Sequence, residues 1–199
     1  MPELPEVEVV KRSLINKVQN LIIKNVKIND EKLRYPIGKF EWKHEMSQEN
    51  FEFHKKKIAN YPNSLENKIK DLSGSDLEKT YRPGGWKISQ LIHHIADSHT
   101  HNYIRFKQAI LVDTPTIMDY KASDWASTDD ATIQDITGSL LMIRGIHQRW
   151  SILLNSIKLD DLQRSYFHPN RDRKYPLHVA LALYSWHGDH HLAHIENTP

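Results

Sequence analysis

Histidine is the residue type in this sequence best suited to chemistry, and most of the 13 histidines gather in two short stretches. The stretches hold His93, His94, His99 and His101, and then His187, His190, His191 and His194. Residues four apart in a helix lie about one turn apart on the same face, and two imidazole nitrogens so placed can bind one divalent ion at roughly 2.0–2.1 Å each. Both His187–His191 and His190–His194 have this spacing, so spacing alone leaves two candidate pairs, or merely polar residues near the end of a helix.

A third ligand should come from another helix, and the earlier histidine stretch offers one. His94 lies at the edge of an expected apolar stripe and His99 lies within it. Asp97, three residues after His94, could hold a ligand imidazole through its second nitrogen. His147 lies on the apolar face of a later expected helix, where we interpret it as lining the core or a cavity rather than as a ligand.

Four amphipathic segments must position these side chains. Each carries hydrophobic residues at steps of three and four, as in a helix that packs in a bundle. The helices are expected at 47–72, 87–111, 131–157 and from 176 onward. Ser47 is the expected N-cap of the first, and Pro62 should kink or break it. The polar stretches 112–130 and 158–175 are expected to be mostly loop.

Composition excludes several classes of function. The 27 Lys and Arg nearly balance the 25 Asp and Glu, so charge gives no reason to expect a nucleic-acid partner. The absence of cysteine excludes disulfides, a thiolate nucleophile and a cysteine zinc site. No apolar run reaches membrane-spanning length, and the acidic, proline-containing start does not resemble a signal peptide. We expect a cytoplasmic protein without a membrane partner.

Several landmarks follow one another along most of the chain. They are YPIGKF at 35–40, YRPGGW at 81–86, HHIADSH at 93–99, IHQRW at 146–150 and YSWHGDHH at 184–191. Together they resemble the YfiT-like metal-dependent hydrolases of the DinB superfamily. The resemblance implies an all-α fold, a DinB-like four-helix bundle over residues 33–199, commonly a homodimer. It also implies one divalent ion held by His94, His187 and His191, for which we expect zinc first, with nickel or another ion as the alternative.

The implied site has the composition of a catalytic centre. Three neutral imidazoles leave coordination positions for water or substrate, so the ion could activate water or act as a Lewis acid on a small molecule. Related superfamily members are thiol S-transferases, which makes transfer of a low-molecular-weight thiol the alternative reaction. No acid–base residue can be assigned, and Asp97 and Tyr184 are the candidates. A bundle without catalytic activity is the remaining alternative.

The first residues resemble a different family. MPELPEVEVV at 1–10 and KLRYPI at 32–37 resemble the start of formamidopyrimidine-DNA glycosylases, in which Pro2 would attack the sugar and Glu3 would act as a general acid. The rest of that enzyme is missing, and a fragment of one expected helix and one strand, at 21–28, cannot bury a core of its own. We therefore expect residues 1–32 to be an appendage and not a working glycosylase, with residues 1–30 packing loosely or not at all against the bundle.

Overall fold

The structure is a computed structural model, and it describes residue 40 and residues 46–198. Pro2, Glu3 and the strand expected at 21–28 lie outside these described residues. Among the helices of the described part, none is both long enough and apolar enough to cross a membrane.

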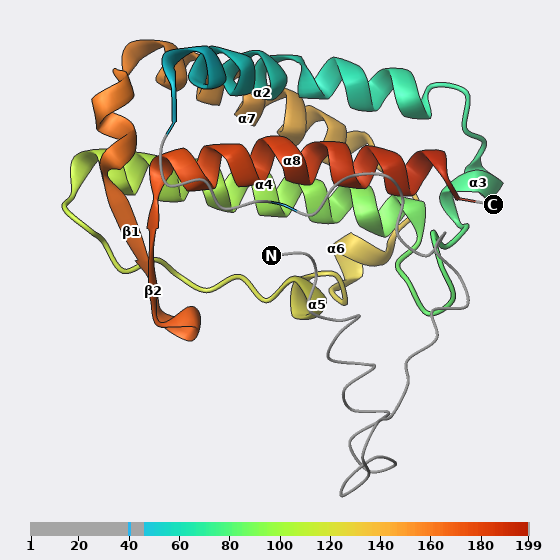
Figure 1. Cartoon of the computed structure of the whole chain (residues 1–199). Coiled ribbons are helices and arrows are strands. Elements are labelled where there is room, and N and C mark those ends of the chain that lie inside the picture. Colours follow the sequence, from blue (N-terminus) through green and yellow to red (C-terminus); the bar gives the residue numbers. More distant parts are fainter. Residues whose placement is uncertain (1–39, 41–45, 199) are drawn as a thin grey trace, which may run out of the picture. The chain divides into compact units, whose positions relative to one another are not determined.

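Four long helices form the bundle, as the all-α expectation predicted. They are α2 (Gln48–Ile69), α4 (Ile88–Leu111), α7 (Thr137–Ser156) and α8 (Leu177–Glu196). Both α2 and α4 pack against α7 and α8, so the first two long helices along the chain occupy opposite corners. Figure 1 shows α2 and α8 running in one direction and α4 and α7 in the other. The α4–α8 contact is the one that brings the two histidine stretches together.

Helix α2 begins where the sequence predicts and continues where a break was expected. The Ser47 hydroxyl accepts a hydrogen bond from the Asn50 backbone N–H at 3.1 Å, which caps the helix. The expected break at Pro62 is wrong, because α2 is helical from Gln48 to Ile69. A proline removes only one helical hydrogen bond, the one that would end on the carbonyl of Ile58. Burial of neighbouring residues of α2, such as Tyr61 and Leu65, offsets that loss.

The third long helix begins later than its apolar pattern predicts. Ile133 continues the three-and-four spacing but is 50% exposed, and α7 starts only at Thr137. The Asp135 carboxylate accepts a hydrogen bond from the Thr137 backbone N–H at 3.0 Å. This side chain satisfies one of the free N–H groups of the first turn and so favours a start at this point.

Both stretches expected to be loop contain regular structure. Residues 112–130 include α5 (Ala122–Trp125) and the start of α6 (Asp129–Thr132), and a further short helix, α3 (Gly74–Leu77), precedes α4. In the other stretch, β1 (Ser165–His168) and β2 (Arg173–Pro176) form an antiparallel hairpin, with 3₁₀ turns at Leu159–Gln163 and Pro169–Arg171. Tyr166 pairs with Tyr175, and their rings stack at 5.7 Å. Four-residue strands carry too little alternation to be recognised from sequence.

Candidate metal centre

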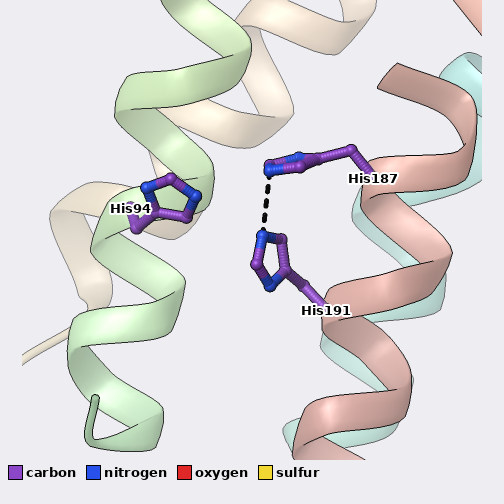
Figure 2. Close-up of side chains that lie close together, drawn as sticks. All are labelled: His94, His187 and His191. Carbon is purple, nitrogen blue, oxygen red and sulfur yellow. Dashed lines mark hydrogen bonds between the residues drawn. The ribbon is translucent and has the colours of Figure 1, made fainter. Parts of the chain in front are cut away.

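Three histidines from two helices converge in the bundle. His94 comes from α4, and His187 and His191 come from successive turns of α8 (Figure 2). One ring nitrogen of each lies within 4.8 Å of those of the other two. The Nε2 atoms of His187 and His191 are 2.9 Å apart. The structure thus brings together the three residues that the sequence resemblance implies.

These imidazoles are held in their neutral form. Burial lowers the pKa of His94 to about 3. Burial also lowers the pKa values of His187 and His191 well below the usual value, and the neighbouring imidazoles lower them further. Neutral imidazole is the form that binds metals, and an all-imidazole set suits zinc, copper, iron or nickel. The donor set therefore fits a divalent transition-metal ion.

The second nitrogen of His94 is held by a tyrosine. The Nδ1 atom of His94 lies 2.8 Å from the hydroxyl of Tyr120, which belongs to the segment between α4 and α5. Asp97 is the candidate for such a role by sequence, but the Nδ1 atom of His94 faces Tyr120. Asp97 is half-buried, and burial raises its pKa to about 6, with nearby Asp130 adding to the rise. The local sequence pattern could not predict the contact between His94 and Tyr120, because the two residues are 26 positions apart and Tyr120 lies in a stretch expected to be mostly loop.

The second nitrogen of His187 is held by another histidine. The Nδ1 atom of His187 lies 3.1 Å from Nε2 of His99, and Nδ1 of His99 lies 2.8 Å from Nε2 of His147. His147 in turn donates from Nδ1 to the carbonyl of Ile58 at 2.6 Å. His99, a candidate ligand by sequence, therefore lies behind the cluster, and His147 lines the core as expected.

Tyr184 borders the cluster without joining it. Its ring centroid lies 5.4 Å from that of His187 and 5.3 Å from that of His99. Its hydroxyl accepts a hydrogen bond from Ser98 at 3.4 Å, and the side chain is buried. An acid–base role for Tyr184 remains a prediction.

Gly188, between His187 and His191, allows α8 to approach α2 closely. A Cβ atom at this position would lie 2.6 Å from the Tyr61 ring, which is far inside van der Waals contact. The Tyr61 ring packs 5.2 Å from each of His99 and His147. The glycine therefore lets an aromatic ring support the histidines behind the cluster.

Comparisons with known proteins agree with this architecture. A family model described as "DinB superfamily" matches residues 61–195. A second model, "Formamidopyrimidine-DNA glycosylase N-terminal domain", matches residues 1–61. Within the residues of this second match, 48–61 form the first part of α2, where Phe51 and Ile58 are buried in the core of the bundle.

Relatives and a solved structure cover most of the chain. A protein of Bacillus cereus (strain ATCC 10987 / NRS 248) named "Putative metal-dependent hydrolase" is 43% identical over 163 residues, 82% of this chain and 93% of the relative. A protein of the same name from Bacillus anthracis (strain A0248) is 42% identical over the same shares.

The solved structure is described as "YfiT from Bacillus subtilis is a probable metal-dependent hydrolase with an unusual four-helix bundle topology". It matches with a TM-score of 0.79 and 35% identity, over 81% of this chain and 93% of that one. This agreement in sequence and in fold covers about four fifths of the chain. The chain therefore belongs to the DinB superfamily.

Proposed function

We propose that this protein is a metal-dependent hydrolase whose divalent ion is held by His94, His187 and His191. The observation that carries the proposal is the convergence of three ring nitrogens within 4.8 Å, from two helices, in a buried setting. The names of the relatives, which call them metal-dependent hydrolases, support the same reaction class. Zinc is the ion we propose first.

An ion bound by three imidazoles retains coordination positions for water or substrate, and it supplies Lewis acidity and a lowered pKa for a bound water. The protein's own residues fix the donors. Tyr120 holds His94 through Nδ1, and His99 holds His187 through Nδ1. Trp86, with its ring centroid 4.8 Å from that of His94, adds an apolar wall on the α4 side.

Metal analysis followed by a substrate screen tests the proposal. We expect the purified protein to bind one divalent ion per chain and His187→Ala to abolish this binding. His190→Ala is the matched control, because His190 comes from the same helix but lies outside the three-histidine group. The hydrolysis of a panel of small esters, amides and phosphoesters should depend on the ion and disappear with His187→Ala.

Other outcomes point elsewhere. An ion-loaded protein that transfers a low-molecular-weight thiol to an electrophile and hydrolyses nothing would replace the proposed reaction by thiol transfer at the same site. Wild-type protein that binds no divalent ion would overturn the site itself. Borohydride trapping on abasic DNA, expected to give no adduct, checks that the glycosylase-like start has no activity of its own.

A further inference from the structure

A continuous line of hydrogen bonds leads from the backbone of α2 to the proposed metal centre. It runs from the carbonyl of Ile58 to His147 on α7, then to His99 on α4, and then to His187 on α8. The three contacts measure 2.6, 2.8 and 3.1 Å, and no ring nitrogen takes part in more than one of them. All four long helices therefore contribute to one line of contacts.

Pro62 explains why this carbonyl is available. In an α-helix the carbonyl of Ile58 would accept a hydrogen bond from the N–H of residue 62, and proline has no N–H. The proline does not break α2. It leaves the Ile58 oxygen without its usual helical donor, and the Nδ1–H of His147 takes that place at 2.6 Å.

The Ile58 carbonyl determines which atom is the donor and which is the acceptor in each of these hydrogen bonds. A carbonyl oxygen can only accept, so His147 carries a proton on Nδ1, and in a neutral ring its Nε2 is then an acceptor. His99 must therefore donate from Nδ1, which makes its Nε2 an acceptor for the Nδ1–H of His187. With Nδ1 protonated, neutral His187 keeps a lone pair on Nε2, the nitrogen that faces His191 at 2.9 Å.

We propose that His147 and His99 are positioning residues. Through their hydrogen bonds to the Ile58 carbonyl and to each other, they fix His187 in the tautomer whose Nε2 can bind the ion. The inference rests on the metal site of the proposed function. Metal-binding histidines commonly donate their second N–H to a carboxylate, a carbonyl or water. Here two buried histidines carry that function across the bundle.

Burial and packing fix the rings in these orientations. His99 and His147 are both 0% exposed. Tyr61 packs against both rings, and Tyr184 contacts His99 edge-on at 5.3 Å. Rings so enclosed cannot exchange their partners for bulk water, so the hydrogen bonds between them decide which nitrogen carries the proton.

Nitrogen-15 NMR of the metal-free protein tests the proposed tautomers directly, without any activity or bound ion. We expect ¹⁵N shifts and two-bond couplings typical of Nδ1–H, Nε2-bare rings for His147, His99 and His187. A proton on Nε2 of His187 in the neutral, folded protein would overturn the proposal. The result is independent of the proposed function, because it holds or fails even if the protein binds no ion.

Affinity for Co²⁺ or Zn²⁺ alone, in variants of His147, tests the consequence for binding. His147→Phe retains ring volume and removes both nitrogens, and it should weaken metal affinity by about 10- to 100-fold, as is usual when a partner of a ligand histidine is lost. His147→Gln should keep the affinity within about threefold of wild type, because one amide can donate to the carbonyl and accept from His99.

The matched control is His178→Phe. His178 is also buried, at 4% exposure, and its Nδ1 lies 3.3 Å from the carbonyl of Leu162, but it has no contact with the line. This variant should leave metal affinity within about threefold of wild type. Equal losses in the two Phe variants would overturn the positioning role. Because His147→Phe could also unfold the protein, its folding is checked by circular dichroism, and the NMR test on wild type stands without it.

Discussion

Two faces of α8 carry histidine pairs of identical spacing and different partners. His187 and His191 meet His94 of α4, whose ring centroid lies 5.4 and 5.1 Å from theirs. His190 and His194 instead pack on aromatic rings, with Trp186 stacked on the first at 4.7 Å and Tyr81 on the second at 4.3 Å. Spacing makes a pair of ligands possible, and contact with α4 decides which pair has a third histidine beside it.

The two faces differ also in what lies behind the imidazoles. The Nδ1 atom of His187 reaches His99, and through it the carbonyl of Ile58. Trp186 and Tyr81 stack on the imidazoles of the other pair. In the first group, one ring nitrogen of His94 and one of His187 have a hydrogen-bonding partner, which is the arrangement usual for metal-binding histidines.

Replacing one histidine on each face by alanine should give the largest difference in metal affinity between two variants. Structural zinc sites bind with roughly 10–16 kcal/mol shared by four ligands, so the loss of one ligand should weaken affinity about 100-fold or more. We expect this for His191→Ala and a change below about threefold for His194→Ala, measured by competition with a chromogenic chelator. Equal effects would mean that the faces do not differ as proposed.

A fall in pH should reduce the stability contributed by the buried histidines of both faces, whereas we expect the metal ion to bind to one face only. Burial lowers the pKa of His194 to about 3, and nearby His190 adds to this shift. The unfolded chain takes up a proton near pH 6.5 and the folded chain does not, so stability is complete above pH 6.5 and falls as the pH falls toward 3. The slope is about 1.4 kcal/mol per pH unit for each such histidine.

Replacement of His194 by Gln isolates this contribution. Urea unfolding of the metal-free protein between pH 7 and pH 4.5 should show a slope smaller by about 1.4 kcal/mol per pH unit in His194→Gln than in wild type. Metal affinity at pH 7.5 should not change. An unchanged acid slope would show that His194 is not held neutral in the folded state.

The sequence predicted the four long helices because each buries one regular apolar stripe, and a stripe depends only on local spacing. It placed the start of α7 too early, because Ile133 fits the spacing but is 50% exposed. It also could not choose between the two faces of α8, since that choice depends on a contact with α4 across about 90 residues. Only the family resemblance selected His94, His187 and His191.

The partners of these three histidines were harder to predict for the same reason. Tyr120 comes from a segment that was expected to be loop, and it meets His94 through tertiary packing. Asp97 is a candidate by sequence because it lies three residues from His94. Pro62 is expected by local rules to kink or break the helix, and in the folded protein it leaves the Ile58 carbonyl to His147. Local sequence rules can mark such a residue as unusual for its helix or loop, but they do not indicate which distant side chain it contacts.

The close approach of α8 to α2 gives the next contrast, between two glycines. Gly188→Ala would place a Cβ atom 2.6 Å from the buried Tyr61 ring, and overpacking of this kind costs about 1–3 kcal/mol. At Gly145, within α7, an added Cβ meets nothing within 4 Å, so Gly145→Ala should stabilise by up to about 1 kcal/mol through helix propensity. Thermal unfolding of both variants checks the opposite signs, and a stable Gly188→Ala would contradict the packing.

The smallest effect is expected where α8 meets α2 and Asp189 forms an ion pair with Lys57. Their side chains are 40% and 32% exposed, and such partly solvated pairs contribute at most about 1 kcal/mol. Asp189→Asn should therefore lower the free energy of unfolding by less than about 1 kcal/mol, with a smaller difference in 1 M salt, and leave metal affinity unchanged. A loss of metal binding in this variant would show that α8 responds as one unit, and that the contrast between its faces is weaker than the hydrogen bonds indicate.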